Sequence, residues 1–370
     1  MTDTKRVRII GRTQIEAITT ERSALETTSA YVAPSGRVEQ RLAKIWRDIL
    51  NIDRVGAEDD FFELGGDSLN GVEVFSAIER AFECRLPLAI LLDSPTIRSL
   101  AAVVGEAGPG DAAEIIVSLR AGGGRAPLFC VHEMSGNVIV YRHLAARMHT
   151  EQPVYGVQYP DPTAERPRTL GLDAMASRYV EAIRSVQAKG PYQLLGFSLG
   201  GLIAYEIAVR LRAAGERVAL LALVDTIAPG HSPKGLKRVL RHGAELFHRR
   251  PWEWPSYVSD RLHNRRARQM KDAAIYRSDS PDGLGARLEY LATEIMPKVR
   301  PGYMPRRYDG RIVLFRCSDD IVLWRGSPDM GWSGLNDGPL EIVDIASTHQ
   351  HVMYAPAVDQ VARHLNASLE

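Results

Sequence analysis

One short segment of this chain has the residue types and spacing of an activated serine nucleophile. It reads GFSLGG over residues 196–201 and follows an apolar stretch. In the pattern G-x-S-x-G, small residues permit the tight turn from a strand into a helix that exposes the serine hydroxyl. Ser198 is therefore the candidate nucleophile, with Gly196 and Gly200 flanking it. We expect the Leu199 N–H to point toward an oxyanion that forms beside the serine.

A nucleophilic serine requires a general base and an acid that orients the base. Two histidines, His349 and His351, lie between the last apolar stretch and a C-terminal helical segment. Either would fit the chain order serine, acid, histidine that is found in α/β-hydrolases.

Two places along the chain could supply the acid. Asp225 directly follows the apolar stretch 218–224, one strand after that of the nucleophile. Asp319 and Asp320 follow the next predicted strand, which is the more usual place for the acid in hydrolases. Residue types alone leave both places open.

A second serine stands in an unusual setting near the start of the chain. Residues 59–69 read DDFFELGGDSL, and Ser68 begins a predicted helix. The plain interpretation of Ser68 is a helix N-cap. The alternative is a modified serine, because a helix start presents free N–H groups and a positive dipole end that favour a bound phosphate.

The elements that must position these residues fall into two groups. Apolar residues at helical spacing predict a compact bundle of three or four helices over residues 37–105. Residues 1–36 are polar and are predicted to be a linker or a remnant of an upstream domain, and residues 106–114 form a second linker. Residues 115–370 alternate apolar and helical segments, which predicts an α/β domain with a mainly parallel sheet. Its predicted strands are 128–131, 192–197, 218–224, 311–315 and 340–345.

The segment around Ser68 resembles the peptidyl carrier domains of nonribosomal peptide synthetases. The resemblance covers about residues 37–105 and includes Trp46 and the SPT sequence at residues 94–96. It implies a four-helix carrier bundle in which Ser68 bears 4′-phosphopantetheine, the arm that holds an acyl or peptidyl thioester. It also implies a phosphopantetheinyl transferase and upstream adenylation and condensation modules as partners.

Residues 115–367 resemble the type I thioesterase domains that terminate such assembly lines, which are α/β-hydrolases with a helical lid. The resemblance implies Asp225 as the acid, and the proline that follows the histidine, Pro356, favours His349 as the base. It implies that the Met134 N–H is the second oxyanion donor. The sequence HEM at residues 132–134 departs from the family, which more often has proline and alanine after the histidine.

Composition limits the remaining possibilities. The chain has 370 residues, a net charge of +1 and three scattered cysteines, which predicts a cytoplasmic protein with reduced thiols and no metal site. The apolar run 218–224 is too short to span a membrane. Residues 234–271 hold eleven Lys or Arg against three acids. Such a segment could bind nucleic acid, but its place inside an enzyme fold favours a lid, which we predict over about residues 230–300.

These patterns together predict the carrier and chain-release unit of a peptide assembly line. An acyl chain would pass from the Ser68 arm to Ser198 and leave by hydrolysis, cyclisation or transfer to another nucleophile. Two alternatives remain: an editing hydrolase that clears misloaded carriers, and a docking scaffold with an inactive esterase half. A nucleic-acid partner is not expected.

Overall fold

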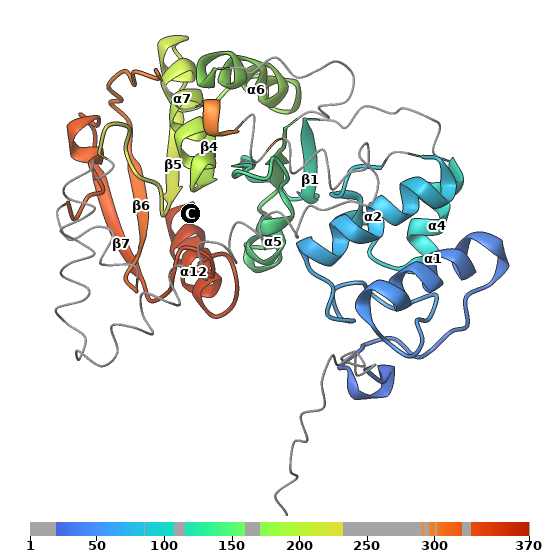
Figure 1. The fold of residues 1–370 in the computed structure, drawn as a ribbon. Helices are drawn as coiled ribbons and strands as arrows, with labels where there is room; N and C mark the ends of the chain where they lie inside the picture. Colours follow the sequence, from blue (N-terminus) through green and yellow to red (C-terminus); the bar gives the residue numbers. More distant parts are fainter. Residues whose placement is uncertain are drawn as a thin grey trace, which may run out of the picture.

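The computed structural model describes residues 20–84, 86–106, 115–159, 171–231, 291, 296–299, 302–319 and 327–369. Within them, a small helical domain is followed by an α/β domain (Figure 1). This confirms the predicted order of a helical bundle and an α/β domain. The predicted lid over about residues 230–300 lies almost entirely outside the described residues; α11 (Met296–Val299) is its one described helix.

The helical domain is built around one buried set of apolar side chains. Its helices are α1 (Gly36–Leu50), α2 (Ser68–Phe82), α3 (Ile90–Asp93) and α4 (Ile97–Glu106). Helix α1 packs against both α2 and α4, because their apolar stripes face a common core. That core contains the fully buried residues Leu42, Trp46, Phe61, Phe75, Ile78 and Leu100.

Residues 20–35, which the sequence analysis assigns to a linker, lie against the helical domain. The Thr20 N–H donates to the Asn51 carbonyl at 2.9 Å, and the Ala57 N–H donates to the Val32 carbonyl at 2.7 Å. The short 3-10 helix η1 (Arg22–Ala24) lies between these two contacts. The described part of the segment is therefore fixed to the bundle at both ends.

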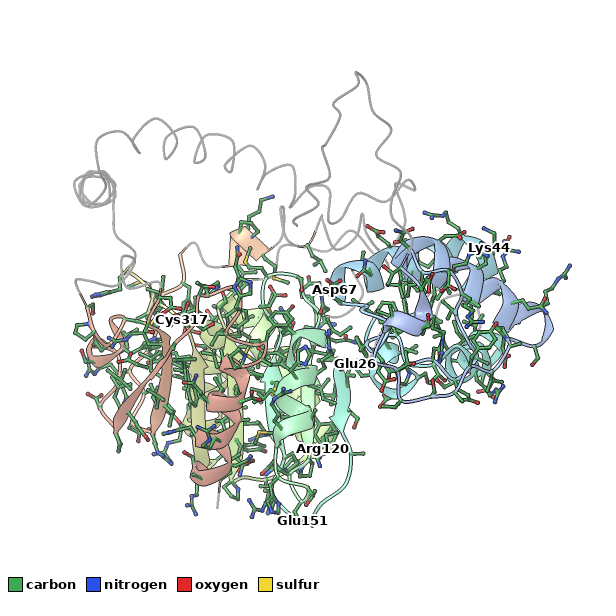
Figure 2. The ribbon with its side chains drawn as sticks, turned by 90° about the horizontal axis from the view of Figure 1, so that it is seen from below. Glu26, Lys44, Asp67, Arg120, Glu151 and Cys317 are labelled. Atoms are coloured by element: carbon green, nitrogen blue, oxygen red, sulfur yellow. The ribbon has the colours of Figure 1, made fainter. Side chains whose placement is uncertain are left out.

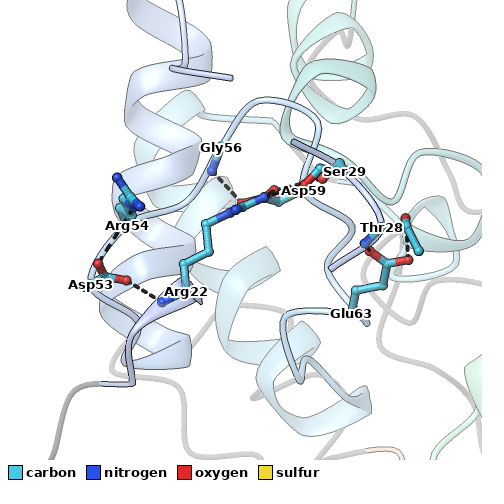
Figure 3. A network of polar contacts seen from close by, with 8 residues as sticks. All are labelled: Arg22, Thr28, Ser29, Asp53, Arg54, Gly56, Asp59 and Glu63. Carbon is cyan, nitrogen blue, oxygen red and sulfur yellow. Dashed lines mark hydrogen bonds and ion pairs between the residues drawn. The ribbon is translucent and has the colours of Figure 1, made fainter. Parts of the chain in front are cut away.

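A buried ion pair joins this segment to the helical domain (Figure 3). The Arg22 Nε donates to Asp59 Oδ2 at 2.7 Å, and its side chain also reaches the Ser29 carbonyl at 2.9 Å. Burial alone would raise the pKa of Asp59. Hydrogen bonds from Arg22, the Gly56 N–H and Ser29 outweigh that effect and hold the pKa below its usual value. Asp59 is thus ionised and paired in the folded protein.

The α/β domain contains a seven-stranded sheet in the order β1-β3-β2-β4-β5-β6-β7. Neighbouring strands are parallel except for β1, which pairs antiparallel with β3 at one edge. The strands are β1 (Ile116–Arg120), β2 (Leu128–Val131), β3 (Val154–Val157), β4 (Tyr192–Phe197), β5 (Val218–Val224), β6 (Ile312–Cys317) and β7 (Leu340–Ile345).

Both faces of the central strands are covered. All six residues of β4 are buried, because alternate side chains enter opposite cores. Tyr192 and Leu194 pack into one apolar cluster with α6 (Leu172–Val186) and α7 (Leu199–Ala213). Leu195 and Phe197 pack into a second cluster with α5 (Arg142–Arg147) and α12 (Ala357–Ser368). Figure 2 shows how densely side chains fill the space between these layers.

The topology brings the ends of β2, β4 and β5 together. These strands are parallel and adjacent, so the residues that follow each of them meet at one edge of the sheet. Ser198 follows β4, Asp225 follows β5, and His132 follows β2. The remaining described elements are the 3-10 helices η2 (Ile139–Tyr141) and η6 (Trp332–Gly334).

Candidate active site and carrier site

Ser198 occupies the sharp turn between β4 and α7. Its backbone has φ 56° and ψ −119°, a conformation that residues with a side chain rarely adopt. A Cβ on Gly196 would lie 2.2 Å from the Gly200 carbonyl oxygen, and one on Gly200 would lie 2.3 Å from the Val131 oxygen. The two flanking glycines are therefore required for this turn to pack against β2.

The serine, the histidine and the acid form one chain of hydrogen bonds. The His349 Nε2 lies 3.1 Å from the Ser198 Oγ, and the His349 Nδ1 lies 2.6 Å from Asp225 Oδ2. Asp225 is buried, with only 2% of its surface exposed, and its other oxygen accepts the Cys317 N–H at 3.2 Å. A buried carboxylate at Nδ1 leaves Nε2 free to take the serine proton.

The alternative acid and base lie elsewhere. Asp319 accepts a hydrogen bond from the Ser318 hydroxyl, and its N–H donates to the Ser347 carbonyl. His351 is exposed and contacts the Thr348 hydroxyl at 2.8 Å. Asp320 lies outside the described residues. The geometry thus groups Asp225 and His349 with Ser198.

The turn after β2 carries Met134, the second predicted oxyanion donor. The Gly136 N–H closes this turn by donating to the Glu133 carbonyl at 3.1 Å. The Glu133 carboxylate accepts the Ser135 N–H at 3.0 Å, and the Met134 N–H lies near enough to act on the pKa of this carboxyl group. Burial raises the pKa of Glu133, and the nearby His349 charge acts to lower it. The Glu133 carboxyl group therefore lies close to the Met134 N–H, the donor predicted for an oxyanion.

His132 forms hydrogen bonds that connect this turn to α6. Its Nδ1 lies 2.7 Å from the Glu133 carbonyl and its Nε2 lies 2.7 Å from the Tyr179 hydroxyl. Since a carbonyl can only accept, Nδ1 carries the proton and Nε2 accepts from the tyrosine. Complete burial lowers the pKa of His132 to about 4, so the ring is neutral at physiological pH.

The sequence analysis missed two residues that hold together the edge of the sheet where Ser198 lies. The Tyr141 hydroxyl donates to the Val131 carbonyl at 2.5 Å and accepts the Phe197 N–H at 3.0 Å. It thereby fixes the end of β2 to the end of β4. The Thr226 hydroxyl lies 3.2 Å from the Ser198 carbonyl oxygen. Neither residue belongs to a motif, because each acts through its position in the folded chain.

The loop before Ser68 is shaped by two glycines and one phenylalanine. Gly65 has φ +86°, and a Cβ on Gly66 would lie 2.5 Å from the Phe61 ring. Helix α2 begins at Ser68, and the N-cap acceptor is Asp67, whose Oδ1 accepts the Asn70 N–H at 2.9 Å. Since Asp67 caps this helix, capping does not account for a serine at position 68.

Comparison with known families assigns both halves. Residues 40–104 match the family described as "Phosphopantetheine attachment site", and residues 126–249 match the family described as "Thioesterase domain". The chain is a carrier domain followed by a thioesterase domain. The cofactor of the carrier domain is covalently attached 4′-phosphopantetheine, and the thioesterase domain is of the serine-hydrolase type.

Relatives of this carrier–thioesterase pair are synthetases. Malpibaldin synthetase from Mortierella alpina is 38% identical over 365 residues, which are 95% of this chain and 6% of that protein. The dimodular nonribosomal peptide synthase of Bacillus subtilis is 29% identical over 371 residues, 95% of this chain and 15% of that protein. The chain therefore spans only a small part of the relatives it matches.

One solved structure aligns with nearly the whole of this chain. A four-domain nonribosomal peptide synthetase in its holo form superposes with a TM-score of 0.57 and 28% identity, over 92% of this chain and 27% of that chain. Among the residues described here, no helix is both long and apolar enough to cross a membrane. Nor do three or more His, Cys, Asp or Glu side chains of the described part gather to hold a metal ion.

Proposed function

We propose that the chain carries and then releases an acyl or peptidyl product of an assembly line. A phosphopantetheinyl transferase would attach the arm to Ser68, and upstream adenylation and condensation modules would deliver the chain to its thiol. The thioesterase domain then takes over the acyl group. The three cysteines of the chain, Cys84, Cys130 and Cys317, are free and buried. Free thiols support a reducing, cytoplasmic setting.

The proposed reaction begins with proton transfer from Ser198 to His349. The serine oxygen forms a bond to the thioester carbon, and the negative charge moves to the carbonyl oxygen. The N–H groups of Met134 and Leu199 would stabilise that oxyanion. Leu199 is the first residue of α7, so its N–H has no acceptor within the helix. The carbon–sulfur bond then breaks, and the thiol of the arm leaves with the proton from His349.

An acyl-Ser198 ester remains after the first step. Water, or a nucleophile on the chain itself or on another molecule, then gives its proton to His349 and attacks the ester. This second attack regenerates the serine and releases the product. The observation that carries the proposal is the chain of hydrogen bonds from Asp225 through His349 to Ser198.

Intact-protein mass spectrometry tests the proposal. The chain is incubated with a promiscuous phosphopantetheinyl transferase and an acyl-coenzyme A, with Ser68→Ala and Ser198→Ala alongside. We expect the acyl-arm mass only where Ser68 is present, and its loss over time only where Ser198 is present. An unmodified Ser68, or loss of the acyl group at the same rate without Ser198, would contradict the proposal. Failure of Ser198 to react with a fluorophosphonate would instead indicate an inactive scaffold.

A further inference from the structure

Arg142, the first residue of α5, lies where the thioesterase domain contacts the carrier domain. Its guanidinium carbon is 4.3 Å from the centroid of the Phe62 ring, within the range of a cation–π interaction. Burial lowers the pKa of Arg142, while Asp67 and Asp60 of the carrier domain act to raise it. The guanidinium therefore lies over an aromatic ring of the loop that leads into Ser68, and two acids of that loop act on it electrostatically.

The Phe62 ring packs against the apolar core of the carrier domain. It packs edge-on against Phe61 with centroids 5.3 Å apart, and Phe61 packs edge-on against Trp46 at 5.0 Å. Phe61 and Trp46 are fully buried. Because Phe62 packs against the buried pair of Phe61 and Trp46, its ring is held in one place beside Arg142.

A second, apolar contact lies beside the first. Helix α3 of the carrier domain contacts β1, the edge strand of the thioesterase sheet. Ala89, next to α3, is buried in the same apolar cluster as core residues of the thioesterase domain, and Leu92, Val117 and Leu119 pack against that cluster. An apolar patch beside a charged contact is the usual composition of a specific interface.

Arg142 also adjoins the loop that bears His349. Tyr354 lies five residues after His349 on that loop. Its ring lies 5.5 Å from that of His143, the neighbour of Arg142. The contact with the carrier domain is thus continuous with the catalytic edge of the sheet, and Figure 2 places Asp67 where the two domains meet.

We propose that Arg142 and the adjoining face of β1, here called the α5–β1 surface, form the docking surface for the carrier domain of this same chain. The inference rests on the proposed function. Phe62 and the acidic loop 60–67 supply the complementary surface. Since Ser68 directly follows this loop, docking fixes the origin of the arm relative to the His349 loop. Opposite charges and the stacked ring make the contact selective for this face of the carrier.

The test compares two substrates of the full chain. In the first, an acyl group is loaded on the Ser68 arm, the loaded fraction is verified by mass spectrometry, and release is followed in a single turnover. In the second, a soluble acyl-N-acetylcysteamine thioester is hydrolysed without help from the carrier. For Arg142→Glu we expect release from the arm to slow at least tenfold, while hydrolysis of the soluble thioester stays within twofold of wild type.

Further variants, including Arg142→Ala alone, sharpen the comparison. Arg363→Glu makes the same charge change at an exposed position of α12 and is expected to leave both rates unchanged. Phe62→Ala is expected to slow release from the arm, and the double variant Phe62→Ala/Arg142→Ala to slow it no further than the stronger single variant, because both changes remove one contact.

Three outcomes would overturn the docking surface. Normal release from the arm in Arg142→Glu would show that the contact is not used. A parallel fall in hydrolysis of the soluble thioester would show that Arg142 acts through the His349 loop. A wild-type chain that is never loaded on Ser68, or that releases its acyl group without Ser198, would overturn the proposed function and the docking surface together.

Discussion

Asp225 reaches His349 from the end of β5, one strand earlier than the position that hydrolases more often use. Its φ of 42° and its bond from the Cys317 N–H fix the carboxylate beside the imidazole. We expect Asp225→Asn to lower kcat for thioester hydrolysis by roughly 10³–10⁴, because an amide cannot hold the required tautomer of His349. Asp319→Asn is the matched control and should keep the wild-type kcat. A similar loss in both variants would contradict the assignment.

Glu133 gives a second prediction at the same scale. Its carboxyl group lies close to the Met134 N–H, so its charge, when ionised, would oppose an oxyanion bound at that N–H. Glu133→Gln keeps the size and an acceptor oxygen but removes that charge. We expect the rate of acylation of Ser198 to rise by roughly tenfold, since one unfavourable charge interaction is worth from about 1 kcal/mol in water to about 4 kcal/mol near a protein surface.

Stopped-flow measurement of acylation with a chromogenic ester would test this prediction. A slower Glu133→Gln variant would mean that the charge stabilises the His349 imidazolium more than it opposes the oxyanion. This feature lay beyond sequence analysis. The sequence marks Glu133 as a departure from related proteins, but only the folded turn shows that its carboxylate accepts the Ser135 N–H and lies near Met134.

At the scale of elements, His132 links the end of β2 to α6 through Tyr179. Its pKa is about 4 in the folded protein against about 6.5 when unfolded. Between pH 4 and pH 6.5, the unfolded chain therefore binds a proton at His132 that the folded chain does not bind. The contribution of His132 to the free energy of unfolding is fully present above pH 6.5. It falls by about 3 kcal/mol as the pH drops toward 4.

Urea unfolding at pH 7, 6 and 5 measures this effect. The slope of the free energy of unfolding against pH reports how many more protons the unfolded state binds than the folded state. His132→Asn should lower that number by up to one. His143, whose pKa is also lowered to about 4 by burial and by neighbouring arginines, remains in both proteins and serves as the common background. Equal slopes in the two proteins would contradict the prediction.

Residues 20–35 behave as part of the helical bundle, and this leads to a fourth prediction. Arg22→Ala leaves the fully buried Asp59 without its partner. We expect the carrier domain to lose about 3–5 kcal/mol of stability, as is usual when one member of a buried pair is removed. Lys44→Ala, which breaks the exposed pair with Asp48, should cost less than about 1 kcal/mol.

Hydrogen exchange of α1 amides, followed by mass spectrometry in the full chain, separates these two values. Equal protection of α1 in Arg22→Ala and wild type would show that the segment contributes nothing to the bundle.

Because residues 20–35 pack against the bundle, we propose a carrier boundary near residue 20 in place of residue 37.

The elements differ in how well they could be predicted. Strands β4 and β5 were predicted to the residue, because each is a continuous apolar run buried on both faces. Strands β1 and β3 were missed. Every residue of β1 is half-buried and Arg120 ends it, while β3 has only four residues and includes Gly156. The packing of residues 20–35 was also missed, because its main contact is an ion pair and polar residues give no hydrophobic period.

At the scale of the whole molecule, motifs predicted the order of the domains but not their contact. Phe62 belongs to the motif before Ser68, and its ring is half-buried. Arg142 belongs to no motif. Their approach depends on how α5 and the carrier loop are placed in three dimensions, which no local pattern encodes. The prediction that follows for the molecule, slower release in Arg142→Glu, is therefore one that only the structure could supply.

The contact between Arg142 and Phe62 joins two parts of one polypeptide, and this has a kinetic consequence. Because carrier and thioesterase share a chain, each meets the other at an effective concentration in the millimolar range, typical of short tethers. The stacked arginine and the apolar patch beside it then need only millimolar affinity to populate the docked state, which lets the carrier leave for the proposed upstream modules. Release should be first order and insensitive to dilution, and a tighter contact would slow the cycle by holding the empty carrier.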